Sequence, residues 1–198
     1  MSLKYFVYVS SVNNLSDARY CSAMMVNYLG FNLDENSKQN LSIDNITEIS
    51  SWINGVKLVG EFNKSSCNYI NKALQKTDFS LIQIDISNVC TNLNFDYENI
   101  IVKIKDLSEH NNSILSELKS NFCKTRIIIV EKFNESNSMI LADLAKKYKV
   151  LINPPLKSIN KTKEILRKYN LGLHLYGSDE IRPGFKDYDS LSSVLDKI

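Results

Sequence analysis

Eight short runs of β-branched and aromatic residues recur along the chain, and segments with a different pattern separate them. The runs lie at residues 4–9, 26–31, 56–62, 79–85, 99–104, 126–131, 149–153 and 171–177. Several of them are almost continuously apolar, which is typical of strands in a parallel sheet that is covered on both faces. The sequence therefore predicts eight strands of one parallel sheet.

The segments between the runs carry apolar residues three and four positions apart, a spacing that gives an α-helix one face to bury. These segments lie at residues 15–25, 42–53, 65–76, 112–122, 136–148, 160–169 and 189–198. Ser16, Ser42 and Asp189 stand near the starts of three of them and are the predicted N-caps. The sequence therefore predicts a helix after nearly every strand.

Strand and helix alternating from end to end predict an α/β fold of βα units, and eight units that close on themselves form a (β/α)8 TIM barrel. The 198 residues suit a single domain, 1–198, of minimal size for this fold. Residues 86–98 are short and polar, so we expect a short or missing helix after strand four. The alternative is an open doubly wound sheet, but no GxGxxG follows the first strand and eight strands favour closure.

Composition narrows the class of partner. The net charge is +2 and the 23% of charged residues are of mixed sign, so no basic stripe predicts a nucleic-acid partner. No apolar run approaches the roughly 20 residues of a membrane span, and the N-terminus lacks a signal-peptide pattern, which predicts a cytoplasmic protein without a membrane partner. The sequence leaves the oligomeric state open.

Cysteine and histidine are sparse and widely spaced. They stand at Cys21, Cys67, Cys90, Cys123, His110 and His174. No CxxC pair or cluster suggests a metal ligand set, so we expect no metal and no cofactor, and we interpret the cysteines as reduced residues in or beside helices. His174 lies inside the last strand, where we expect a hydrogen-bonded interior imidazole.

In a closed barrel the working residues follow the carboxyl ends of the strands. The candidates at those positions are Ser10, Ser11, 32–39, Asn63, Asp85, Lys105, Glu131, 153–155 and 177–180. Ser10, which ends the first strand, is the first of them. We therefore expect any ligand-binding or catalytic site at this end of the barrel.

Four segments, taken in order, resemble the phosphoribosylanthranilate isomerases. SSVNNLSDARYCSAMMVNYLGF (10–31) is similar to the start of that family, where a strand ending Lys-Ile-Cys-Gly precedes an Asp-Ala pair and a strand ending Gly-Phe. VKLVGEFN (56–63) resembles a third strand reading Val-Gly-Val-Phe, and LIQI (81–84) keeps the glutamine of the fourth. EIRPGFKDYDSL (180–191) matches a Glu followed by Pro-Gly-x-Lys-Asp-x-Asp-Ser. The resemblance covers the chain from the first strand to the last helix.

The resemblance implies an Amadori rearrangement of a phosphoribosyl amine, a step of tryptophan biosynthesis that needs one acid and one base. In the family a cysteine is the base, and Ser10 stands in its place, with Tyr8 at the lysine position and Ser11 at the glycine position. The family's acid, an aspartate that ends strand six, falls on Val130 or, with a one-residue shift, on Glu131. Glu131 can serve as the acid, or it can form a rim ion pair with its neighbour in sequence.

The Ser10 hydroxyl is a poor base unless a neighbouring group activates it, and no histidine ends a nearby strand. The family's substrate arginine falls on Gln39, beside a retained Lys38, and a histidine after strand four becomes Asp85. A Gly-Gly phosphate turn becomes 154–155, two prolines without N–H donors.

The segment at 177–180, which includes Gly177 and Ser178, keeps donors for an anion. The resemblance thus implies an isomerase-like barrel for a small phosphorylated sugar or other anion, with the family activity weak, changed or lost. The alternatives are a non-catalytic ligand-binding or regulatory barrel and a structural subunit of a larger assembly.

Overall fold

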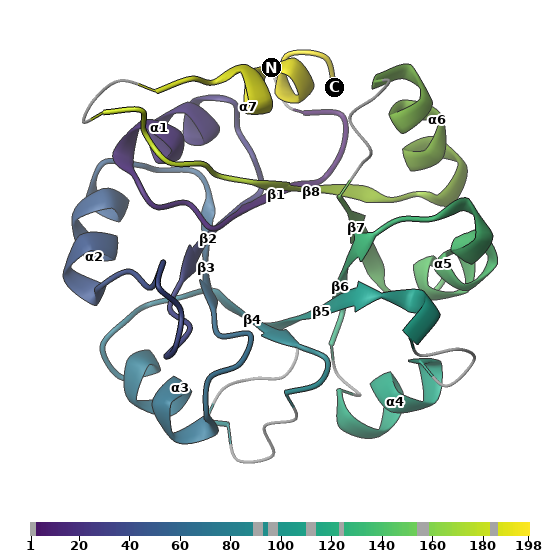
Figure 1. Cartoon of the computed structure of the whole chain (residues 1–198), viewed down its shortest axis with the longest axis horizontal. Coiled ribbons are helices and arrows are strands. Elements are labelled where there is room, and N and C mark those ends of the chain that lie inside the picture. Colours follow the sequence, from purple (N-terminus) through teal and green to yellow (C-terminus); the bar gives the residue numbers. More distant parts are fainter. Residues whose placement is uncertain are drawn as a thin grey trace.

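Eight parallel strands form a closed barrel in the computed structural model (Figure 1), which describes residues 3–88, 93–94, 99–109, 114–122, 125–153, 159–182 and 186–198. The strands are β1 (Val7–Ser10), β2 (Tyr28–Asn32), β3 (Lys57–Glu61), β4 (Leu81–Asp85), β5 (Ile100–Asp106), β6 (Ile127–Lys132), β7 (Lys149–Ile152) and β8 (Gly172–Tyr176). Each strand pairs with the next, and β1 pairs with β8, Ser10 opposite Tyr176. The predicted TIM barrel is confirmed, and the open sheet is excluded.

A ring of helices surrounds the barrel (Figure 1). In the described residues these are α1 (Leu15–Ala23), α2 (Ile43–Ser51), α3 (Cys67–Leu74), α4 (Ile114–Asn121), α5 (Ser138–Ala145), α6 (Ile159–Tyr169) and α7 (Asp189–Leu195), with 3-10 turns η2 (Leu107–Glu109) and η4 (Glu135–Asn137). Between β4 and β5 the described residues contain no α-helix, as predicted, while 89–92 and 95–98 lie outside them.

Two of the three predicted N-caps are wrong. Ser42 does cap α2, because its side chain accepts a hydrogen bond from the Asn45 N–H at 3.2 Å. Helix α1 is capped two residues before Ser16, by Asn14, whose side chain accepts from the backbone of the third helical residue. Asp189 is the first residue of α7 rather than its cap. An amide oxygen competes equally well for a cap position, so the sequence alone did not select between neighbours.

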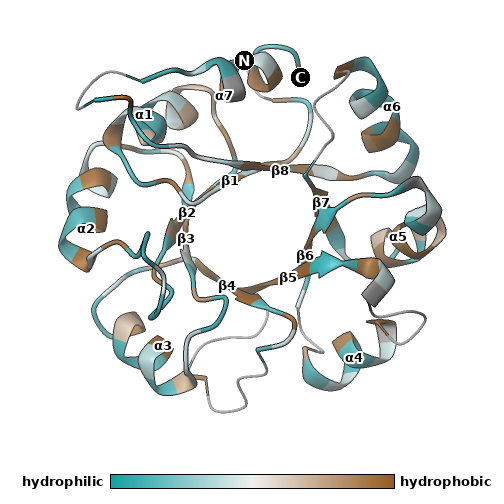
Figure 2. Ribbon diagram, viewed as in Figure 1, coloured by the Kyte–Doolittle hydropathy of each residue, from teal (hydrophilic) through white to brown (hydrophobic). Residues whose placement is uncertain are grey.

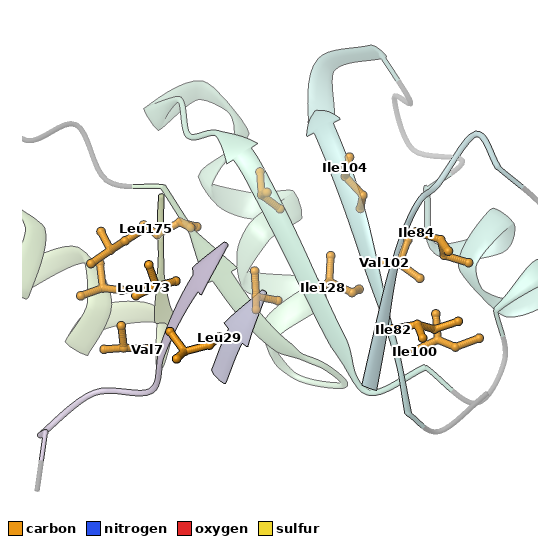
Figure 3. Packing of buried hydrophobic residues seen from close by; sticks show 14 of the residues in the cluster. Val7, Leu29, Ile82, Ile84, Ile100, Val102, Ile104, Ile128, Leu173 and Leu175 are labelled. Atoms are coloured by element: carbon orange, nitrogen blue, oxygen red, sulfur yellow. The ribbon is translucent and has the colours of Figure 1, made fainter. Parts of the chain in front are cut away.

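The core has two layers because side chains alternate along each strand. One layer fills the barrel interior and is formed by Tyr8, Val59, Leu81, Ile101, Ile129 and Leu151. The other lies between strands and helices, and Figure 3 shows part of it, with Ile82, Ile84, Ile100 and Val102 packed together on β4 and β5. Figure 2 shows hydrophobic residues along the strands and a mixture of both kinds in the surrounding helices.

The cysteines differ in state. Cys21 is a buried free thiol, as expected, and burial raises its pKa to about 12. Cys67 is disulfide-bonded, so the interpretation of it as reduced is wrong, because sequence spacing does not reveal which cysteines meet in the fold. Cys90 and Cys123 lie outside the described residues.

The described part of the chain has neither a membrane-spanning helix nor a cluster of metal ligands. None of its helices is both long and apolar enough to cross a membrane. No three of its His, Cys, Asp and Glu side chains gather in a way that could hold a metal ion.

Candidate functional site

Polar side chains line the barrel interior at the carboxyl ends of the strands. Five of them lie two positions after a residue of the apolar interior layer and therefore face the same side of their strands. They are Ser10, Glu61, Gln83, Lys103 and Glu131. Along these five strands the barrel interior therefore changes from an apolar layer to a polar layer at the carboxyl end, which we call the mouth of the barrel.

Ser10 is held in place inside the barrel and is 1% exposed. Its hydroxyl donates to the Leu175 carbonyl at 3.2 Å, and the Nε2 atom of His174 lies 2.8 Å from its oxygen. No histidine ends a nearby strand, as the sequence indicated, but His174 inside β8 contacts Ser10 because β8 pairs with β1 and brings its interior side chains alongside.

His174 is not a base for this serine. The ring is fully buried, and burial together with the nearby Lys103 ammonium lowers its pKa to about 3, so the imidazole is a much weaker proton acceptor than an ordinary histidine. Its Nδ1 atom is buried without a hydrogen-bond partner among the described residues, so the expected hydrogen-bonded imidazole is satisfied on one side only. Ser10 therefore has neither an ionised hydroxyl nor a free path to a ligand.

Glu61 is the most enclosed carboxyl group of the mouth, at 2% exposed, and sequence analysis did not single it out. Its Oε1 accepts from the Tyr8 hydroxyl at 3.0 Å and from the Ser11 N–H at 2.8 Å, and its Oε2 accepts from the Ser11 hydroxyl at 3.2 Å. Burial raises the pKa of Glu61, and these hydrogen bonds and Lys103 oppose the shift. Burial and Glu61 also raise the pKa of Tyr8.

This cluster accounts for two further positions. A Cβ atom on Gly30 would lie 2.0 Å from Glu61 Oε1 and 2.3 Å from the Tyr8 hydroxyl oxygen, so only glycine leaves room for the pair. Ser11 has φ 54°, the left-handed region that favours glycine, and it stands where the resembling family has glycine. Two hydrogen bonds to Glu61 hold Ser11 in this conformation and so shape the β1–α1 loop.

Glu131 forms the second charged cluster. Its Oε1 accepts from the Tyr176 hydroxyl at 2.5 Å and lies 3.3 Å from the Lys103 ammonium, and its side chain is 22% exposed. The rim pair with Lys132 is wrong, since Lys132 lies 3.8 Å from Asp106. Val130 belongs to the layer between strands and helices, so of the two candidates for the acid position it is Glu131 that faces the mouth.

A buried ion pair joins the two ends of the chain that carry the resemblance. The Lys186 ammonium lies 3.0 Å from Asp17 Oδ2, and their side chains are 1% and 0% exposed. The same Asp17 oxygen accepts from the Ser178 N–H at 2.9 Å, and the Gly177 N–H donates to the Ser10 carbonyl at 2.8 Å. Both amides foreseen as anion donors are thus engaged within the protein.

A cavity of about 300 Å³ opens at the mouth between the β1–α1 loop and the segment after β8. It is lined by Ser11, Val12, Asn13, Asn32, Gln39, Tyr176, Gly177, Ser178 and Asp179. Three of the five predicted ligand-binding residues, Gln39, Gly177 and Ser178, therefore meet in one place.

The other binding candidates lie apart from this cavity. Lys38 is exposed beside Gln39 but does not line it. Asp85 instead closes its own loop, accepting from the Ser87 N–H at 2.9 Å and from its hydroxyl at 2.6 Å. The two prolines at 154–155 lie outside the described residues.

Sequence reasoning missed Glu61, Lys103 and Tyr176. A usable signal was present, because in β3 and β5 a charged residue continues the every-second-residue series of interior positions after Val59 and Ile101. The candidates chosen from the sequence follow the ends of the apolar runs, whereas Glu61 and Lys103 are the last inward-facing residues within β3 and β5.

No known family model matches the chain, and no curated protein sequence matches it. Solved structures do match. The phosphoribosylanthranilate isomerase of Thermotoga maritima has a TM-score of 0.70 at 16% identity, with 98% of each chain covered. That of Pyrococcus furiosus has a TM-score of 0.69 at 14% identity, again covering 98% of each chain.

A third structure, a phosphoribosylanthranilate isomerase in complex with reduced 1-(o-carboxyphenylamino)-1-deoxyribulose 5-phosphate, has a TM-score of 0.68 at 16% identity and covers 98% of this chain and 97% of its own. At these identities the likeness concerns the fold, since one barrel type supports many chemistries. The chain therefore has the fold of the phosphoribosylanthranilate isomerases along nearly its whole length.

Proposed function

We propose that this protein is an isomerase-like barrel that binds a small polar ligand at its mouth and has lost the Amadori rearrangement or keeps only a trace of it. The observation that carries this proposal is the state of Ser10. It stands where the resembling family has its base, yet it is 1% exposed and its hydroxyl is bound to Leu175. A base must reach the proton that it removes.

The acid side of the reaction is better preserved. Glu131, the last but one residue of β6, has a partly exposed carboxyl group, and Tyr176 and Lys103 hold it in position. Protonation of a ring oxygen without a base to take the carbon proton leaves the rearrangement incomplete. Loss of one positioned acid–base group costs about 10²- to 10⁴-fold in rate.

A second candidate function is a weak isomerase acting on phosphoribosylanthranilate or a related phosphosugar. Its support is Glu131, together with the similar isomerase that was solved with a ribulose 5-phosphate derivative. In this alternative a water molecule or a substrate group replaces the missing base. The buried ion pair of Asp17 and Lys186, which holds the Ser178 amide, counts against tight phosphate binding there.

Complementation of a tryptophan auxotroph that lacks the isomerase tests the proposal. We expect no growth without tryptophan from the wild-type gene, even when the protein is abundant. Ser10→Cys is the informative variant, because it supplies the family's thiol at an enclosed site beside His174, and we expect it to fail as well. Growth at a rate comparable to an authentic isomerase gene would refute the loss of activity, and Glu131→Gln would then show whether that carboxyl group is the acid.

A further inference from the structure

We infer that the ligand of the mouth cavity is an uncharged polyhydroxylated molecule, a free pentose or hexose, rather than a sugar phosphate. This inference rests on the proposed function, because it takes the mouth as a ligand site. It goes further by assigning the chemical class of the ligand. The argument uses the hydrogen-bonding capacity and the charge of the residues that line the cavity.

The size of the cavity suits one sugar ring. Its volume of about 300 Å³ lies at the lower end of the range for small-molecule sites, roughly 300 to 1,000 Å³. Its polar lining comes from three loops and two strand ends, so the groups converge from different sides. A molecule with hydroxyl groups on several carbons can bond to several of them at once.

Three side chains of the lining offer acceptors, beside the donors of Gln39 and Ser178. Tyr176 gives its only hydroxyl hydrogen to Glu131, and Ser11 gives its own to Glu61, so both oxygens present lone pairs toward other partners. Asp179 accepts from the Asn13 side chain and, as a carboxylate, keeps further acceptor sites. Sugar hydroxyls, which can all donate, match this arrangement.

The charge of the site argues against a phosphate. The described residues that line the cavity include one carboxylate, Asp179, and no lysine or arginine. Two lysines near the mouth are each paired with a carboxylate, Lys103 with Glu131 at 3.3 Å and Lys186 with Asp17 at 3.0 Å, and Lys186 also donates to the Ser178 hydroxyl and the Asp179 carbonyl behind the lining. A phosphate dianion would therefore meet a negative group, whereas phosphate sites rely on cations and free backbone N–H groups.

Titration of the full chain with D-ribose, D-glucose and their 5- and 6-phosphates tests the inference, with NMR chemical shifts as the readout. We expect at least one free sugar to show saturable shifts and its phosphate ester to bind about tenfold more weakly or worse, which is the loss of roughly one good hydrogen bond or one unfavourable charge contact. Tighter binding of the phosphate ester would overturn the inference but leave a ligand-binding mouth intact.

Two matched variants locate the binding. Asp179→Asn should weaken sugar binding about fivefold, because it removes a charged acceptor from the cavity. Asp143→Asn makes the same chemical change on α5, where Asp143 pairs with Lys146, and should leave the affinity unchanged. Equal affinity in wild type and Asp179→Asn would overturn the assignment of the site, and no binding of any of the four compounds would overturn both this inference and the ligand-binding part of the proposed function.

Discussion

Replacing Gly30 by alanine should destabilise the barrel strongly, through contact with the hydrogen-bonded side chains of Glu61 and Tyr8. The new Cβ would lie 2.0 Å from Glu61 Oε1, 2.3 Å from the Tyr8 oxygen and 3.0 Å from the Glu61 carboxyl carbon. Relief requires the carboxyl group to move by more than an ångström, which breaks its hydrogen bonds to Tyr8 and Ser11. Overpacking costs about 1–3 kcal/mol and unpaired buried donors about 1–3 kcal/mol, so we expect a loss of about 3–5 kcal/mol.

A double-mutant cycle separates this cause from a general intolerance of β2. Glu61→Ala alone leaves the Tyr8 and Ser11 donors unpaired and should cost about 2–4 kcal/mol. In that background only the Tyr8 hydroxyl oxygen remains close to the new Cβ, and it is no longer bound to Glu61, so Gly30→Ala should cost at least about 2 kcal/mol less than in the wild type. Gly172→Ala is the control, because its Cβ would meet Leu151 and Phe6 instead, and its cost should add to that of Glu61→Ala.

Urea unfolding followed by far-UV circular dichroism measures these free energies. Circular dichroism is the better signal because the single tryptophan, Trp52, is 64% exposed and reports weakly on burial. Equal costs of Gly30→Ala with and without the Glu61 side chain would refute the argument that the Glu61–Tyr8 pair is what requires glycine at this position.

Three further results are expected. Lys186→Met should cost about 3–5 kcal/mol in urea unfolding because it leaves the Asp17 carboxylate buried without its counter-charge, and a second change, Asp17→Asn, should recover part of that loss. Ser11→Gly should change the free energy of unfolding by less than about 0.5 kcal/mol, because glycine relieves the left-handed backbone strain while it loses the hydroxyl bond. Ser11→Ala should lower that free energy by about 1 kcal/mol or more, since alanine keeps the strain and loses the same bond. Equal effects of the two variants would contradict the assigned strain. The pKa of His174 is lowered from 6.5 to about 3, so the unfolded chain takes up a proton that the folded chain refuses, and stability should fall by at most about 5 kcal/mol as pH drops from 6.5 to 3. His174→Gln should flatten that pH profile, and an unchanged profile would show that another group causes it.

The sequence predicted the barrel well because the signals for its strands and helices are spread along the whole chain. Eight apolar runs and the helical spacing between them each carry a small amount of information, and errors of one or two residues at the ends of elements do not change the topology. The sequence alone also showed where the chain departs from the pattern of the resembling family, at Ser10, Gln39 and the two prolines at 154–155.

The site was harder to predict because it depends on which strands become neighbours. The contact of His174 with Ser10 requires β8 to close against β1, which no local pattern states. Glu131 forms its ion pair with Lys103 on the adjacent strand rather than with Lys132, its neighbour in sequence, because side chains alternate between the two faces of a strand. Glu61 reads as an ordinary charged strand residue until its burial is known.

The central claim is that this chain has the isomerase fold without an effective base. Turnover of phosphoribosylanthranilate by the purified protein, followed by loss of the substrate's fluorescence beside an authentic isomerase, tests that claim most directly. If Ser10 cannot act as the base and the Gly177 and Ser178 amides cannot bind phosphate, kcat/KM should be about 10⁴-fold or more below that of the authentic isomerase. A value within tenfold of the authentic enzyme would contradict the account and would mean that a group other than Ser10 removes the proton.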